Sequence, residues 1–340
     1  MLNWVEIEAG ALRSNVNEFR RRLGHGPRLG AVIKSNAYGH GMIEVARIAA
    51  AAAVDWLCVN NVDEAVTLRQ SGLTLPILVM GYIPLDGLEA VAAFGIQPVI
   101  YNLETIDRLQ AIASERGTIV DVHVKIETGT HRQGVLERDV PAFMARLRDA
   151  RALRLAGVTT HFANIEDSTN HEFAESQIAA FTRIADAIAG LHPVPFLRHN
   201  ACSAAVLLFN RTHLDLVRVG ISLYGLWPSK ETYVSCLERG KPSLELKPVM
   251  TWKTRIAQVK PVAEGGYVGY GCAWRGRCSR TRCSPPRAPS SPARCAFSRK
   301  APAAARAKPC RARGTRRRSP SRATGRRARC RCARGRGASG

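Results

Sequence analysis

The chain has 340 residues, of which 46% are apolar, and this is enough to bury the core of one large domain with a smaller one beside it. Such a composition excludes a chain that is disordered throughout. The longest apolar stretch, IAAAAAVDWLCV, is interrupted by Asp55 and is too short to span a bilayer, so we expect no membrane segment. The first residues, MLNWVEIEAG, lack the basic start and apolar core of a signal peptide. We therefore expect a cytoplasmic protein.

The formal charge of +23 is concentrated at the C-terminal end of the chain. Residues 275–340 contain 20 Arg and 2 Lys with no Asp or Glu, whereas the first 274 residues hold 28 basic and 27 acidic residues. Six of the ten cysteines also lie in 275–340, and the other four are far apart, without a C-x-x-C pair. The sequence therefore has two compositions, and only the first is typical of a folded, reduced protein.

The residues from 275 to 340 are almost all Arg, Ala, Pro, Ser, Gly and Cys, so we expect this tail to be disordered. GC-rich codons give these residue types when they are read out of frame, and we interpret the tail as the result of a frameshift near codon 274. The alternative is a basic arm that binds nucleic acid nonspecifically, although Phe297 is its only aromatic residue and base stacking is hardly supported. Without His or a C-x-x-C pair, the tail predicts no metal site.

Short runs rich in β-branched and apolar residues alternate with longer segments of helical period before the tail. The runs predict eight strands, over residues 30–34, 56–60, 76–81, 97–102, 120–127, 155–162, 196–201 and 216–225. The intervening segments predict helices, for example over residues 62–72, 103–117, 140–153 and 171–190. This alternation predicts the α/β class and favours a closed (β/α)8 TIM-type barrel; an open doubly wound sheet is the alternative.

The helical period stops near residue 240, and residues 250–274 predict strands around a Glu-Gly-Gly turn. We therefore divide the chain into three parts. A barrel covers residues 1–240, and the start of a second, mainly β domain covers residues 241–274. Residues 1–9 could also join that domain, which then breaks off, and the tail covers residues 275–340.

Lys34 ends the first predicted strand, in the stretch RLGAVIKSNAYGHG. In a barrel, residues at the carboxyl ends of strands face the active-site mouth. A lysine partly removed from water there has a lowered pKa and can form a Schiff base with an aldehyde such as that of pyridoxal phosphate. A salt-bridged or snorkelling lysine is the alternative that placement alone leaves open.

The residues after Lys34 carry a more specific signal. AVIKSNAYGHG resembles the pyridoxal-phosphate attachment signature of the alanine racemases, a fold-type III family. HVKIETGTHRQGV, TTHFANIED, RHNACSAAV, LVRVGISLYG and VGYGCAW follow in the order and at intervals similar to those of the family. The resemblance extends to Trp274. It implies a homodimeric isomerase that interconverts L-alanine and D-alanine with pyridoxal phosphate, for cell-wall peptidoglycan.

The resemblance also implies roles for individual residues. Lys34 would hold the cofactor and act as the base on one face of the substrate Cα, and Tyr270, supplied by the other subunit, would be the base on the opposite face. Arg132 would contact both the cofactor and the substrate. The implied cofactor-binding residues are Lys34, Tyr38, Arg132, His161, Ser203, Arg218, Gly220 and Ile221.

Arg218 would face the pyridine nitrogen of the cofactor. A guanidinium can only donate hydrogen bonds, so that nitrogen would stay unprotonated and the ring would be a weaker electron sink. His161 would stack near the ring, and Tyr38 would reach the phosphate. We interpret His123, His131 and His171 as structural or exposed.

The sequence departs from the family in two places. Cys202 stands where many members have asparagine, and nothing after Trp274 matches the family's Met-Asp pair or its late tyrosine. The alternatives are a non-racemising pyridoxal-phosphate-binding barrel, and a racemase of serine or of broader specificity. We expect alanine and a second copy of the chain as partners, no membrane, and nucleic acid only nonspecifically through the tail.

Overall fold

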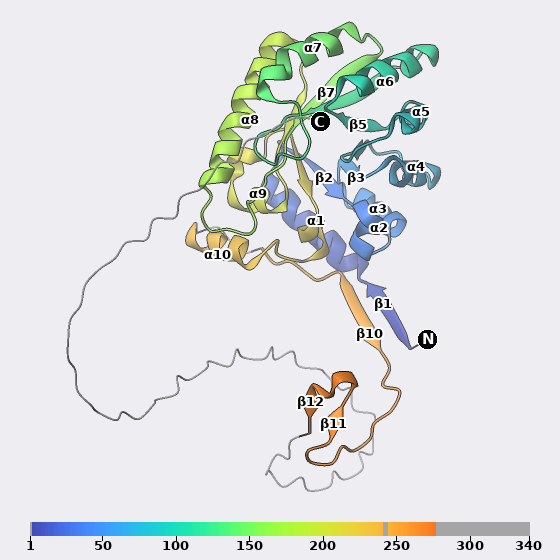
Figure 1. Cartoon of the computed structure of the whole chain (residues 1–340), viewed down its shortest axis with the longest axis vertical. Coiled ribbons are helices and arrows are strands. Elements are labelled where there is room, and N and C mark those ends of the chain that lie inside the picture. The colour runs from blue at the N-terminus through green and yellow to red at the C-terminus, as the bar shows by residue number, and fades with distance from the viewer. Residues whose placement is uncertain (1, 241–243, 277–340) are drawn as a thin grey trace, which may run out of the picture. The chain divides into compact units, whose positions relative to one another are not determined.

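The computed structural model describes residues 2–240 and 244–276, and the predictions for most of the tail fall outside these residues. The chain divides into two compact units, Met1–Val259 and Lys260–Gly340. The first unit holds eight parallel strands with helices around them (Figure 1). Among the described residues, no helix is both long and apolar enough to cross a membrane.

The eight strands form one sheet in the order β8-β7-β6-β5-β4-β3-β2-β9. Their bounds are β2 Arg28–Val32, β3 Trp56–Val59, β4 Ile77–Val79, β5 Gln97–Ile100, β6 Val120–Lys125, β7 Leu153–Thr159, β8 Leu197–His199 and β9 Leu216–Val219. The two end strands also meet, because the Arg218 amide donates to the Ala201 carbonyl at 3.0 Å and the Asp215 amide to the Arg198 carbonyl at 3.1 Å. The predicted TIM-type barrel is therefore confirmed. Six strands lie within the predicted runs, and β2 and β7 overlap theirs but each begin two residues earlier.

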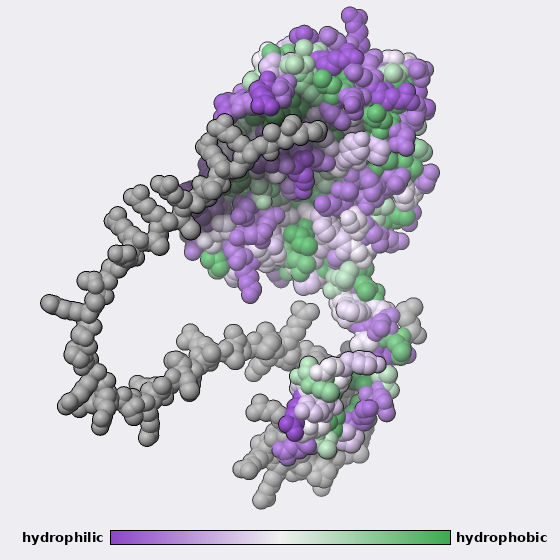
Figure 2. Space-filling view, viewed as in Figure 1, coloured by the Kyte–Doolittle hydropathy of each residue, from purple (hydrophilic) through white to green (hydrophobic). Residues whose placement is uncertain are grey.

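Helices surround the sheet. Their bounds are α1 Ala9–Leu23, α3 Met42–Ala51, α4 Val62–Gln70, α5 Leu88–Ala93, α6 Leu103–Glu115, α7 Val140–Asp149, α8 Glu172–Leu191, α9 Ser203–Leu208 and α10 Lys230–Glu238. The longest, α8, buries residues at helical spacing, among them Ala174, Ile178 and Phe181. Hydrophilic residues cover much of the outer face of this unit in view (Figure 2). The helices thus turn one apolar face to the sheet.

The barrel interior is filled separately from the layer between strands and helices. A small cluster consists only of strand residues: Val32, Trp56, Cys58, Leu78, Val99 and Leu216. Because alternate residues of a barrel strand point inward, this cluster fills the interior. Polar residues of the barrel strands, including His123 on β6, His199 on β8 and Arg218 on β9, are also buried. The interior is therefore apolar in part and carries a polar layer.

A pair of antiparallel strands completes the first unit: β1 (Asn3–Ile7) pairs with β10 (Met250–Thr254), with Asn3 opposite Thr254. The second unit, taken by itself, contains a short antiparallel pair, β11 (Tyr267–Val268) and β12 (Trp274–Arg275). Between them lies a 3-10 turn, Tyr270–Cys272.

Candidate active site

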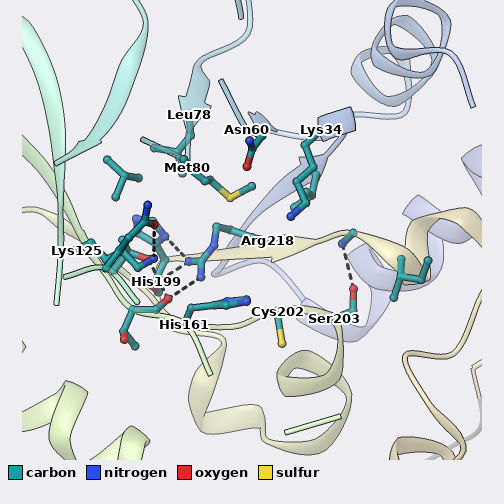
Figure 3. Close-up of a pocket in the computed structure, with 18 of the residues that line it drawn as sticks. Lys34, Asn60, Leu78, Met80, Lys125, His161, His199, Cys202, Ser203 and Arg218 are labelled. Atoms are coloured by element: carbon teal, nitrogen blue, oxygen red, sulfur yellow. Dashed lines mark hydrogen bonds between the residues drawn. The ribbon is translucent and has the colours of Figure 1, made fainter. Parts of the chain in front are cut away.

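A cavity of about 530 Å³ lies at the carboxyl ends of the barrel strands. Each of the eight residues predicted from the barrel lines it: Lys34, Tyr38, Arg132, His161, Ser203, Arg218, Gly220 and Ile221. Figure 3 shows Lys34, His161 and Arg218 around this space. Residues that are far apart in the sequence are thus gathered in one site.

Lys34, which lines the cavity, is followed by an unusual backbone turn. Strand β2 ends at Val32, two residues earlier than predicted, and Lys34 begins α2 (Lys34–Gly39). The four residues from Ser35 to Tyr38 have φ between 53° and 54°, in the left-handed region that non-glycine residues avoid at a cost of about 1 to 2 kcal/mol each. Hydrogen bonds hold the turn: the Ser35 amide donates to Glu64 Oε1 at 2.5 Å, and the Met42 amide to Asn36 Oδ1 at 2.8 Å.

Small groups meet opposite this turn. The Gly220 amide donates to Ser203 Oγ at 3.0 Å. A Cβ on Gly220 would lie 2.7 Å from the Tyr38 hydroxyl oxygen, so only glycine leaves this space open. Burial raises the pKa of Tyr38 to about 12, and its hydroxyl therefore keeps its proton. Hydroxyl groups and a side-chain-free backbone segment form a cradle of the kind that suits a phosphate.

Arg218 lies at the floor of the cavity and is buried. Its Nη1 donates to His199 Nδ1 at 2.5 Å and to the His199 carbonyl at 3.0 Å, and its Nη2 donates to the Thr160 carbonyl at 2.9 Å (Figure 3). In the described part of the chain no carboxylate forms an ion pair with it. Its buried charge is therefore uncompensated, and an anion in the cavity would be favoured.

The cavity as a whole is cationic. Lys34, Lys125, Arg132 and Arg218 line it, and Glu166 is the only acidic residue among the described residues that line it. Burial, together with Arg218, Arg132 and the two lysines, lowers the pKa of His161 to about 3, so its imidazole is neutral at physiological pH. This balance of charges suits a small molecule that carries phosphate and carboxylate groups.

Lys125 was not singled out from the sequence, although it ends β6 as Lys34 nearly ends β2. Its side chain is buried, and Nζ donates to Gln133 Oε1 at 3.4 Å. Burial, then the charges of Arg132 and Arg218, lower the pKa of Lys125 to about 8, against the weaker opposing effect of Glu127. The strand-end rule that pointed to Lys34 applies to Lys125 only because β6 ends there, whereas the predicted run continued to Glu127.

Two further residues complete the comparison with the sequence. Cys202 lines the cavity beside Ser203, and burial raises the pKa of its thiol to about 11, so the thiol stays neutral.

Tyr270 belongs to the second unit, where it begins the 3-10 turn and its side chain is fully exposed. Its pairing with Lys34 therefore stays a prediction.

Known proteins share both the sequence and the fold. The family model "Alanine racemase, N-terminal domain" matches residues 7–228. An alanine racemase of Syntrophobacter fumaroxidans is 41% identical over 272 residues, which cover 79% of this chain and 69% of that protein. One of Desulfovibrio desulfuricans is 38% identical over 268 residues, with coverage of 79% and 70%.

Solved structures agree with the sequence matches. An alanine racemase of Clostridium difficile 630 superposes with a TM-score of 0.74 at 32% identity, over 82% of this chain and 70% of that one. The enzyme of a D-cycloserine-producing Streptomyces lavendulae gives a TM-score of 0.74 at 31% identity, over 81% and 71%. The barrel, the residues gathered at its mouth and these matches lead to one conclusion: the chain belongs to the alanine racemase family.

Proposed function

We propose that this chain binds pyridoxal phosphate through Lys34 and that, as a homodimer, it interconverts L-alanine and D-alanine. The observation that carries the proposal is the meeting of an amine, an uncompensated guanidinium and a side-chain-free cradle in one cavity. A strand-end lysine can hold an aldehyde, the cradle suits a phosphate, and Arg218 suits an aromatic nitrogen acceptor. The residues present therefore fit this cofactor.

The chain's own residues divide the work between holding and proton transfer. Ser203, Gly220 and Tyr38 would hold the phosphate, while Arg218 would offer an N–H to the ring nitrogen. When bound, pyridoxal phosphate withdraws electrons from the substrate and makes its Cα proton labile. Lys34 Nζ would then take or return that proton on one face of Cα. Arg132, at the mouth of the cavity, would bind the cofactor and the substrate carboxylate.

Racemisation also needs a base on the opposite face of Cα, and we assign it to Tyr270 of a second subunit. A homodimer is required by this assignment. Trp252, Ile256 and Val259 expose 74–85% of their surface, and such apolar side chains are candidates to be covered by a further β domain or by a second copy. With residues 275–340 as they stand, we expect low activity. The D-alanine formed would serve peptidoglycan synthesis in a bacterial-type cytoplasm.

The proposal is tested by incubating the purified protein with pyridoxal phosphate and L-alanine, with L-serine in parallel, and by separating the products on a chiral column. We expect D-alanine from the wild type and none from Lys34→Ala. Lys230→Ala is a matched control, because Lys230 is exposed at the start of α10. If D-serine forms faster than D-alanine, serine replaces alanine as the proposed substrate. If no D-amino acid forms at any protein concentration, the racemase assignment for this chain is overturned.

A second candidate is a barrel that binds the cofactor without racemising amino acids. It is favoured by one observation: every predicted cofactor-binding residue belongs to the first unit, whereas the second base belongs to the other. Binding of pyridoxal phosphate at Lys34 without any D-amino acid product would support this candidate over the first.

A further inference from the structure

Behind Arg218, a chain of hydrogen bonds runs across the barrel interior away from the cavity. Arg218 Nη1 meets His199 Nδ1 at 2.5 Å, His199 Nε2 meets His123 Nδ1 at 2.9 Å, and His123 Nε2 meets Gln97 Oε1 at 3.1 Å. The side chains come from β9, β8, β6 and β5 in turn. Both histidines are 0% exposed, so water does not compete for these bonds.

Gly157 makes room for this chain of bonds. It lies on β7, between the strands of the two histidines, opposite His123 on one side and Leu197 on the other. A Cβ at Gly157 would be only 2.3 Å from His123 Nδ1. Any other residue there would displace the imidazole, so the contact between His123 and His199 depends on this glycine.

The chemistry of the first group sets the direction of every bond. A guanidinium has no acceptor, so Arg218 donates and His199 Nδ1 is unprotonated. A neutral His199 then carries its proton on Nε2 and donates it to His123 Nδ1. His123 in turn carries its proton on Nε2 and donates to Gln97 Oε1. One tautomer of each ring fits the contacts, and it is the same tautomer in both.

The far end imposes the same direction independently. The indole Nε1 of Trp56 can only donate, and it lies 3.0 Å from Gln97 Oε1. Gln97 Nε2 donates to Asp121 Oδ2 at 3.5 Å, which orients the amide the same way. Gln97 Oε1 is therefore an acceptor for His123 as well. Neither end of the chain of bonds allows the reverse polarity.

The two rings are held neutral by their surroundings. Burial lowers the pKa of His123 to about 3, with Arg218 acting in the same direction and Asp121 against it. Burial, Arg218 and His123 place the pKa of His199 well below its usual range. A protonated His199 could not accept from Arg218, so neutrality is a condition for the arrangement.

We propose that His199, His123 and Gln97 form a one-way hydrogen-bond relay that positions Arg218 as a donor toward the cavity. His199, which also lines the cavity, and His123 are positioning residues, since the role proposed for them is exerted through Arg218. Among the described residues, the other acceptors of the guanidinium are the backbone carbonyls of Thr160, His199 and Asn200. His199 Nδ1 is the one side-chain acceptor among them. The effect on the cofactor rests on the proposed function, whereas the relay itself does not.

The first test therefore uses the full chain without cofactor. Protein labelled with ¹⁵N-histidine is examined by long-range ¹H–¹⁵N NMR, which reports which ring nitrogen carries the proton. We expect His123 and His199 both to be protonated on Nε2 alone, without change between about pH 5 and pH 8. A proton on Nδ1 of either ring, or titration of either ring in that range, would overturn the relay even if the chain binds no cofactor.

Variants test whether the relay positions Arg218. His123→Leu removes the acceptor for His199, whereas His123→Asn keeps a side-chain oxygen that can accept from His199 Nε2. We expect His123→Leu to lose the single tautomer of His199 and to weaken pyridoxal phosphate binding about tenfold, and His123→Asn to restore much of both. His25→Leu, at an exposed position, is the matched control.

The outcomes separate the relay from the proposed function. If His123→Leu does not fold, the tautomers of the wild type and of His123→Asn still decide the question. A His123→Leu protein with the wild-type His199 tautomer and unchanged cofactor affinity would overturn the positioning role. Wild-type tautomers as expected, with no cofactor bound by any variant, would refute the proposed function and leave the relay standing.

Discussion

Replacement of Lys125 by methionine should make the protein more stable at neutral pH, because a buried ammonium is costly. Lys125 is 6% exposed, and its pKa is about 8 in the folded protein against an ordinary value of 10.5. At about 1.4 kcal/mol per pH unit, this difference corresponds to about 3 kcal/mol. Because the folded protein releases the proton more readily than the unfolded chain, the cost is complete below pH 8 and fades as the pH rises toward 10.5.

The Lys125→Met variant keeps a side chain of similar length without the charge. We expect its free energy of unfolding at pH 7 to exceed that of the wild type by about 2 to 3 kcal/mol, with the loss of the hydrogen bond to Gln133 accounting for the lower value. The difference should shrink between about pH 8 and pH 10.5, since groups common to both proteins cancel.

Urea titrations followed by circular dichroism at several pH values measure this difference. Lys230→Met serves as the control, because Lys230 is exposed and its replacement should change stability by less than about 0.5 kcal/mol at every pH. A Lys125→Met protein that is no more stable than the wild type at pH 7, or a gain that does not depend on pH, would refute the reasoning.

Three other expectations concern the cradle, the turn and the gene. Gly220→Ala should weaken pyridoxal phosphate binding, measured by calorimetry, at least about tenfold, because its Cβ would lie 2.7 Å from the Tyr38 hydroxyl oxygen. Unchanged affinity would contradict the role of the cradle in binding the phosphate. Ser35→Val should lower the free energy of unfolding by about 1 to 2 kcal/mol, because a β-branched residue resists a φ of 54°, whereas Ser35→Gly should not lower it. Equal losses of stability for the two variants in urea titrations would refute the claim that the turn is strained. Translation of the DNA beyond codon 274 in the other frames should give alternating strands with a Met-Asp pair and a late tyrosine; their absence in all frames would discard the frameshift.

The barrel could be predicted from the sequence because parallel strands buried on both faces are continuous apolar runs, and each of the eight runs overlaps one strand. The left-handed turn could not be predicted in this way. Ser35 and Ala37 have no intrinsic preference for positive φ, and Asn36, which tolerates it better, does not predict four such residues in a row. The contacts of the folded protein, such as that of the Ser35 amide with Glu64, hold them there.

The site was predicted in part. Resemblance leads to eight residues that line one cavity, whereas it does not name Lys125 and His199, which line the cavity from the ends of β6 and β8, two residues before the predicted runs end. The sequence predicts His123 to be structural or exposed, and the structure buries it fully. Sequence alone does not say which polar residue of a strand points into the barrel, since that depends on register. The partners of His123, which lie 26 and 76 residues away in the chain, are brought to it only by the closed sheet.

The central claim is that Lys34 holds pyridoxal phosphate in this cavity. The most direct test is to incubate the protein with one equivalent of pyridoxal phosphate, reduce it with borohydride, digest it and locate the phosphopyridoxyl group by mass spectrometry. The account predicts one modified residue, Lys34, with no modification at this site in Lys34→Ala and little elsewhere. A label on Lys125, or one spread over exposed lysines such as Lys230 and Lys253, would contradict it.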